Sequence, residues 1–236
     1  MNKVILFLVE GETDRKSLAL AFAKLIGNRA QFFVIRTDIT SDKDTTTNNI
    51  ESLIVERVSH FLSEKSYLSC SDIKMVVQIT DTDGTFVEGD KVCFDSDRDK
   101  IHYSDECMYT NKVEATIQRN QRKSENIKYL CNLEKINVDD VDIPYRIYFM
   151  SCNLEHVLHN LPNVETQEEK ETLATAFRKS VDKDTNKLRD ILFAPGIDCS
   201  GEYEDSWGFI QRGLNSLKRK SNLSHFFTNY IDKRDR

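Results

Sequence analysis

The sequence predicts an α/β protein in which a mostly parallel sheet is flanked by helices. Three apolar runs, residues 3–9, 31–36 and 73–80, are rich in branched and aromatic side chains and read as strands. Between them, residues 13–26 and 50–62 repeat apolar side chains at helical spacing. Strands that alternate with helices of about a dozen residues are typical of βαβ units, and such units build a parallel sheet.

The first strand and the first helix have clear boundaries. Residues 3–9 form a continuous apolar run, as expected of a strand that is buried on both faces. The helix that follows can be capped by Glu12 or Thr13. Gly27 comes directly after its last apolar residue, and glycine is common at that position because it ends a helix without strain.

The second βα unit has the same design. The strand at residues 31–36 is followed by a polar stretch, residues 40–49, which serves as a loop and as a cap for the next helix. That helix, residues 50–62, has its apolar side chains three and four positions apart. The third strand, residues 73–80, is mostly apolar and is followed directly by Asp81.

The chain is less regular after residue 83. Residues 84–142 are predicted to be an insertion with a charged helical segment at 111–134, and residues 145–150 return to the sheet. Four helices are predicted further on, at residues 154–159, 167–179, 185–192 and 206–231, the last with a break near residue 221. We therefore expect one domain over residues 1–160, interrupted by the insertion, and a helical lobe over residues 161–236.

Charge and composition narrow the class of protein. The net charge of −6 excludes a uniformly basic nucleic-acid-binding surface, although a local basic patch stays compatible with it. The apolar run at residues 4–9 is interrupted by Glu10 long before the roughly 18 residues that a membrane span needs, and no basic leader precedes it. We expect a cytoplasmic protein. Its six cysteines are never two residues apart, so reduced structural thiols are expected.

Four acidic residues follow predicted strands at one edge of the sheet. Glu10 ends the first strand, Asp81 and Asp83 end the third, and Glu155 follows the fourth. In an open parallel sheet, ligands bind beyond the carboxyl ends of the strands. Clustered carboxylates suit hard cations such as Mg²⁺ or Mn²⁺. Taken singly, Glu10 could be a helix cap, and Asp81 and Asp83 could form a turn with Gly84.

Two of these motifs resemble a known family. FLVEGETD, which contains Glu10, and ITDTDG, which contains Asp81 and Asp83, resemble the TOPRIM domain of type IA topoisomerases, bacterial primases and OLD-type nucleases. SCNLEHVLH, which contains Glu155, is similar to a later element of stand-alone TOPRIM proteins of bacterial anti-phage defence. The resemblance covers roughly residues 3–160 and implies a TOPRIM-like, Rossmann-type sheet.

The resemblance also implies an activity. We expect a Mg²⁺-dependent endonuclease that cleaves DNA or tRNA, as the toxic effector of an abortive-infection system. Asp81 and Asp83 would hold Mg²⁺ or Mn²⁺, Glu155 would support the metal, and Glu10 would be a ligand or the general base. Lys218, on a predicted helix, is the candidate cation for the phosphate, with a solvated helix face as the alternative.

The resemblance further implies partners. Nucleic acid is the expected substrate, and an ATPase of the AAA or ABC type is the expected regulator. The sequence is also compatible with a homo-oligomer. No membrane association is expected.

Two other functions stay open from the sequence. DTDGT after an apolar strand also begins haloacid-dehalogenase-like phosphatases, in which Asp81 would be the nucleophile, Asp83 the acid/base, and the acids at 138–142 the later metal ligands. Alternatively, the chain could be a non-catalytic TOPRIM-like protein that binds nucleic acid or a partner.

Overall fold

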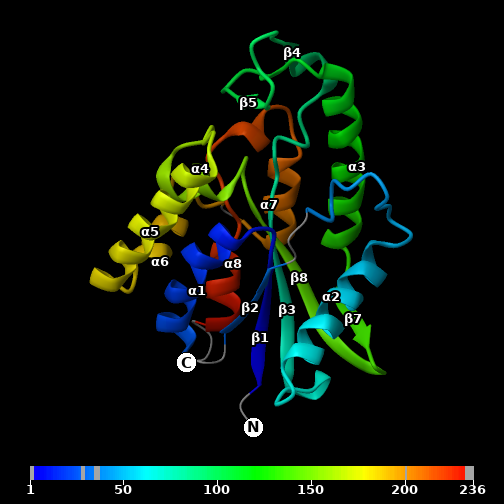
Figure 1. Ribbon diagram of the computed structural model, residues 1–236, viewed down its shortest axis with the longest axis vertical. Coiled ribbons are helices and arrows are strands. Elements are labelled where there is room, and N and C mark those ends of the chain that lie inside the picture. Colours follow the sequence, from blue (N-terminus) through cyan, green and yellow to red (C-terminus); the bar gives the residue numbers. More distant parts are fainter. Residues whose placement is uncertain (1–2, 28–29, 35–37, 200, 232–236) are drawn as a thin grey trace. The chain divides into compact units, whose positions relative to one another are not determined.

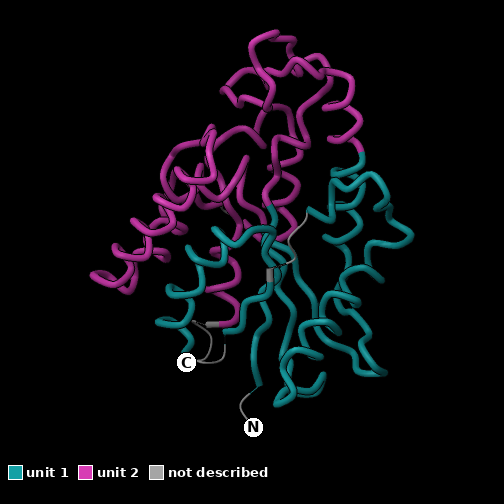
Figure 2. Tube along the Cα trace, viewed as in Figure 1, with its two compact units in different colours: residues 1–80, 122–148 teal, residues 81–121, 149–236 magenta. Residues whose placement is uncertain are grey.

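The computed structural model describes residues 3–27, 30–34, 38–199 and 201–231 (Figure 1). The chain divides into two compact units, which are coloured in Figure 2. Unit 1 comprises residues 1–80 and 122–148, and unit 2 comprises residues 81–121 and 149–236. This division differs from the predicted boundary at residue 160, because both units are assembled from two separate segments of the chain.

A five-stranded sheet, most of it in unit 1, forms the centre of the fold. Its strands have the order β2-β1-β3-β8-β7. β1 pairs in parallel with both β2 and β3, whereas β7 and β8 form an antiparallel hairpin. The expectation of an α/β fold with a mostly parallel sheet is confirmed. The strands are β1 Val4–Val9, β2 Ala30–Val34, β3 Ile73–Asp81, β7 Lys135–Val138 and β8 Val141–Met150.

The two predicted helices of unit 1 are confirmed. α1 spans Glu12–Ile26 and packs against β2, and α2 spans Ile50–Glu64 and packs against β7. The β1-to-β2 and β2-to-β3 connections cross the sheet in opposite directions. Because such connections are right-handed, α1 and α2 cover opposite faces (Figure 1). Positions 35 and 36 of the second predicted strand lie outside the described residues.

Aromatic side chains fill the core between α1 and the sheet. The ring centroid of Phe7 lies 4.5 Å from that of Phe22 and 4.7 Å from that of Phe32. All six residues of β1 are buried, as the continuous apolar run predicts. This core holds β1 in the interior of the sheet, between β2 and β3, and therefore fixes where its carboxyl end lies.

Unit 2 begins with a small sheet that the sequence analysis missed. Its three strands have the order β4-β6-β5: β4 is Val92–Phe94, β5 is His102–Tyr103 and β6 is Met108–Thr110. Cys93 and Cys107 form a disulfide beside this sheet. The expectation of reduced thiols is wrong for this pair, because β4 and β6 pair side by side and bring the two cysteines together, although 14 residues separate them in the chain.

The predicted insertion, residues 84–142, is divided between the units. Its helix, α3 Val113–Cys131, has its first residues in unit 2 and its last in unit 1. β7 belongs to the main sheet. The charged helix is confirmed, and its C-terminal half is part of the unit 1 fold.

The C-terminal part is helical, as predicted, but its last helix is not continuous. The helices are α4 Leu154–His159, α5 Gln167–Lys183, α6 Lys187–Leu192, α7 Tyr203–Ile210, η4 Asn215–Leu217, α8 Ser224–Phe226 and η5 Phe227–Ile231. The predicted break near residue 221 is confirmed, because Ser221 forms β-bridges to Met150 and Asp198. The prediction of a continuous helix from residue 206 to that break is wrong: α7 ends at Ile210, and Gly213 has a positive φ of 54°.

Within the described ranges, no helix has both the length and the apolar character that a membrane crossing requires.

Candidate functional site

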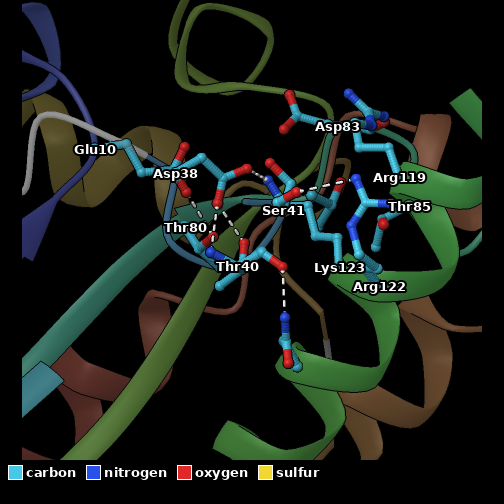
Figure 3. Close-up of polar contacts among 12 residues, drawn as sticks. Glu10, Asp38, Thr40, Ser41, Thr80, Asp83, Thr85, Arg119, Arg122 and Lys123 are labelled. Carbon is cyan, nitrogen blue, oxygen red and sulfur yellow. Dashed lines mark hydrogen bonds and ion pairs between the residues drawn. The ribbon is translucent and has the colours of Figure 1, made fainter. Parts of the chain in front are cut away.

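Glu10 lies at the carboxyl end of β1 in unit 1. The hydroxyl group of Thr80, near the end of the neighbouring strand β3, donates a hydrogen bond of 2.7 Å to Glu10 Oε1 (Figure 3). Glu10 is half-buried. Asp14, by contrast, accepts a hydrogen bond from the Gly11 amide and caps α1. The structure therefore places the Glu10 carboxylate at the edge of the sheet where the sequence predicts it.

A buried ion pair holds the loop that leads to α2 in unit 1. Lys123 of α3 is fully buried, and its Nζ lies 2.5 Å from Asp38 Oδ2 (Figure 3). Burial alone would raise the pKa of Asp38, but the Lys123 charge and the hydrogen bonds from Lys123, Thr40 and Ser41 lower it to about 2. Asn126 also donates to the Thr40 carbonyl group, so α3 fixes this loop.

A tight turn follows β3 in unit 2. The Thr82 amide donates to the Met150 carbonyl group at 2.9 Å, and the Asp83 amide donates to that of Cys152 at 2.8 Å. Asp83 has a φ of 47° and Gly84 has a φ of 66°. The left-handed conformation is rare for residues other than glycine, but aspartate tolerates it. The sequence Asp-Thr-Asp-Gly therefore encodes this turn as well as a pair of carboxylates.

Arg119 of α3 braces the turn. Its guanidinium group donates a hydrogen bond of 2.8 Å to the Asp83 carbonyl oxygen (Figure 3). The Thr85 hydroxyl group donates to the Asn120 carbonyl oxygen at 2.9 Å. Main-chain carbonyl oxygens accept both hydrogen bonds, so these contacts with α3 hold the backbone of the turn and thereby orient Asp83.

Asp81 and Asp83 line a pocket that lies wholly in unit 2. Its volume is about 510 Å³. One wall is formed by residues 97–103 and a second by residues 162–166. Three cationic side chains, Arg98, Lys100 and Lys170, line the pocket together with five acidic ones, which are Asp81, Asp83, Asp97, Asp99 and Glu165. The pocket therefore combines paired carboxylates with cations that can face an anion.

Tyr103 joins the two walls of the pocket. Its amide donates to Asn163 Oδ1 at 2.7 Å, and Asn163 Nδ2 donates back to the Tyr103 carbonyl oxygen at 2.8 Å. The Tyr103 hydroxyl group donates a longer hydrogen bond of 3.4 Å to Asp83 Oδ1. Tyr103 therefore contacts Asn163 of the second wall through its backbone and Asp83 through its side chain.

The Ser/Cys-x-x-Glu element is buried beside the turn. Cys152 donates its amide hydrogen to the Thr82 hydroxyl oxygen at 3.0 Å. Burial, and then the charges of Asp83 and Asp81, raise the pKa of the Cys152 thiol well above its usual range. The thiol is therefore protonated at neutral pH. Glu155, 5% exposed at the start of α4, forms an ion pair of 3.6 Å with Lys170.

Lys218 is not on a helix with Arg212 and Arg219. It follows η4, is exposed and donates to Asn215 Oδ1 at 2.9 Å, and it is not among the residues that line the pocket. The prediction of a shared basic helix face is wrong, because α7 ends at Ile210. Arg219 points elsewhere and donates two hydrogen bonds to the Val157 carbonyl oxygen.

The donor set fits a hard cation. Mg²⁺ is commonly held by one or two carboxylates, with waters and substrate phosphates as its other ligands. Asp81 and Asp83 supply two carboxylates in an open, polar pocket. In the described part of the chain, no group of three or more His, Cys, Asp or Glu side chains is arranged to hold a metal ion.

Sequence reasoning missed Lys100, Tyr103, Asn163 and Lys170. Each belongs to a polar stretch without a motif, and their common pocket arises only because β5 is clamped to the loop after α4. Glu10 belongs to unit 1, whereas Asp81, Asp83 and Glu155 belong to unit 2, so the predicted site that joins these four carboxylates stays a prediction.

Neither protein-family models, nor curated proteins, nor solved structures include a match to this chain.

Proposed function

We propose that this chain is a divalent-metal-dependent hydrolase of phosphodiester bonds in nucleic acid. One observation carries the proposal: Asp81 and Asp83 line the same pocket as Arg98, Lys100 and Lys170. Paired carboxylates bind the cation that a phosphoryl transfer needs, and basic side chains bind the anionic substrate. A pocket for a neutral ligand needs neither group in such numbers.

The residues of the pocket have separate roles in this proposal. Asp81 and Asp83 hold Mg²⁺ or Mn²⁺, which supplies an activated water and neutralises charge on the phosphoryl oxygens. Thr82 and Arg119 fix the turn so that both carboxylates keep their orientation. Lys100 and Lys170 bind phosphate oxygens. Lys170 also pairs with buried Glu155, which is proposed to support the metal site and to hold this lysine at the pocket.

Glu10 is proposed to take part as a further ligand or as the general base. Thr80 donates to its carboxylate in unit 1, and Asp81 follows Thr80 directly in the chain.

The phosphatase alternative is disfavoured by unit 1 itself. Its later metal ligands would come from residues 138–142, which form the turn between β7 and β8. Asp139 accepts a hydrogen bond of 3.5 Å from Cys70, which comes just before the start of β3. Thr80 lies at the other end of β3, about 23 Å away at the usual strand rise. Those acids therefore flank the wrong end of the strand.

The proposal is tested by cleavage of plasmid DNA and total tRNA with Mg²⁺, Mn²⁺ or EDTA. Asp81→Asn and Asp83→Asn should each reduce the cleavage rate at least about 100-fold, while Asp190→Asn, an exposed control on α6, should cleave like the wild type. Cleavage that persists in EDTA, or in both pocket variants, would overturn the proposal. Turnover of a generic phosphomonoester through a covalent aspartyl phosphate would favour the phosphatase instead.

The role in anti-phage defence and the partner ATPase rest on the family resemblance alone. We propose both as the setting in which the nuclease acts, because a cell tolerates a toxic nuclease only if it is held inactive. Co-expression with the product of a neighbouring ATPase gene, followed by co-purification and a toxicity assay, tests this. A protein that is toxic alone and unaffected by the ATPase would contradict it.

A further inference from the structure

The Tyr103 ring lies between the hydrophobic interior of unit 2 and the pocket. It packs against a cluster of buried residues formed by Val87, Met108, Cys152 and Leu217, and it also lines the pocket. Its backbone is clamped to Asn163 by two hydrogen bonds, and its hydroxyl group donates to Asp83. The ring is therefore held at both ends, and little conformational entropy is lost when a ligand packs on it.

Apolar surface continues around the ring. Ile101 belongs to the same wall as Tyr103 and packs against the same hydrophobic cluster. Pro162 and Val164 come from the opposite wall. A pocket built only for phosphate and metal has no use for this apolar surface. A nucleobase does, because each base offers a flat face that stacks on aromatic and apolar side chains.

We propose that this pocket receives one unpaired nucleotide, with its base stacked on Tyr103 and its phosphates against Lys100 and Lys170. The preferred substrate is then single-stranded nucleic acid, DNA or RNA, or an unpaired loop. This deepens the proposed nuclease function and rests on the same site. The reason for the preference is geometric: in a duplex, both faces of each base are covered by neighbouring base pairs, so no face is left for Tyr103.

Binding measured without metal tests the proposal separately from catalysis. Fluorescein-labelled oligonucleotides, as single-stranded DNA, single-stranded RNA and the matching duplex, are titrated with protein in EDTA at one fixed salt concentration. The wild type should bind at least one of the single strands more tightly than the duplex. The DNA and RNA arms show which sugar the pocket prefers, and equal or tighter binding of the duplex would overturn the proposal.

Three substitutions assign the preference to the ring. Tyr103→Leu removes the aromatic face and should weaken single-strand binding by about 5- to 150-fold. Tyr103→Phe keeps the face and should bind like the wild type. Tyr67→Leu, at a tyrosine that is 63% exposed in unit 1, is the matched control and should also bind like the wild type. Wild-type binding by Tyr103→Leu would refute stacking, as would an equal loss in Tyr103→Phe, which would assign the effect to the hydroxyl group.

A measurement on the unaltered protein guards against a misfolded variant. A single strand that carries 5-bromouracil is crosslinked by ultraviolet light, and the protein is digested and mapped by mass spectrometry. A crosslink within residues 97–103 or 162–166 supports the proposal, and crosslinks only elsewhere overturn it. If the strand binds through Tyr103 but is never cleaved with Mg²⁺, the stacking proposal stands and the nuclease proposal fails. If the strand is cleaved but neither binding nor cleavage depends on Tyr103, the nuclease proposal stands and the stacking proposal fails.

Discussion

Replacing Gly84 with alanine tests the turn that presents Asp83 to the pocket. Gly84 has a φ of +66°, where a residue with a Cβ atom is strained by roughly 1–2 kcal/mol. An added Cβ would also lie 2.7 Å from Met108 Sδ and 3.0 Å from Leu217 Cδ2. Such overpacking of a dense interior costs about 1–3 kcal/mol. We therefore expect Gly84→Ala to lower the free energy of unfolding by about 2–5 kcal/mol.

Urea denaturation followed by tryptophan fluorescence measures this loss. The chain has a single tryptophan, Trp207, which is buried in unit 2 and therefore reports on the unit that contains the turn. The midpoint of the transition should fall with little change in its slope. The metal-dependent activity of Gly84→Ala should fall as well, because any shift of the turn moves Asp83.

Gly208→Ala is the matched control, with the opposite expected sign. Gly208 lies within α7, and an added Cβ would meet no atom within 4 Å. Alanine is favoured over glycine in a helix by about 0.5–1 kcal/mol, so this variant should be slightly more stable than the wild type. Wild-type stability of Gly84→Ala, or destabilisation of both variants to the same extent, would show that the strain and the close contacts at the turn are misjudged.

Three further predictions concern unit 1 and the small sheet. Lys123→Met leaves the Asp38 charge buried without its partner and should lower the free energy of unfolding by about 3–5 kcal/mol, whereas Lys128→Met, on the exposed face of α3, should change little. The pKa of the Asp38 carboxyl group is about 2 in the folded chain and about 3.9 in the unfolded chain. Its contribution to the free energy of unfolding is therefore present above about pH 4 and is lost as the pH falls to about 2. In acid unfolding, the free energy of unfolding should fall by about 2 kcal/mol over this interval, and this fall should be absent in Lys123→Met. Cys93 and Cys107 should resist alkylation until reductant is added, as measured by mass spectrometry. Reduction of this disulfide should lower the free energy of unfolding of unit 2 by about 2–4 kcal/mol. Rapid alkylation of both cysteines without reductant would contradict the disulfide.

Local patterns predicted the elements well where burial is continuous. β1 and β3 were found from unbroken apolar runs, and α4 was placed at its observed bounds, residues 154–159. These patterns are reliable because a strand or helix must bury a face whatever else it contacts. The placement of Glu10 at the end of β1 follows from the same pattern.

The same reasoning failed where distant segments decide the local conformation. Residues 206–231 have helical spacing, yet α7 ends at Ile210, and Ser221 forms isolated β-bridges to Met150 and Asp198 before α8 begins. Lys218 was chosen as the phosphate-binding cation from a helix that ends at Ile210. The strands β4, β5 and β6 are only two or three residues long, too short for an alternating pattern to be read.

By itself the sequence determined the α/β class, the burial of β1, and the two aspartates at the end of β3, because each depends on residues adjacent in the chain. Only the tertiary structure decided which side chains share a pocket with those aspartates. Lys170 lies 87 positions after Asp83, and nothing in the spacing between them encodes a contact. They line one pocket because α5 packs against α4 and because Tyr103 is hydrogen-bonded to Asn163. Side chains from distant segments meet because buried surfaces fit together, and that fit is a property of the whole fold.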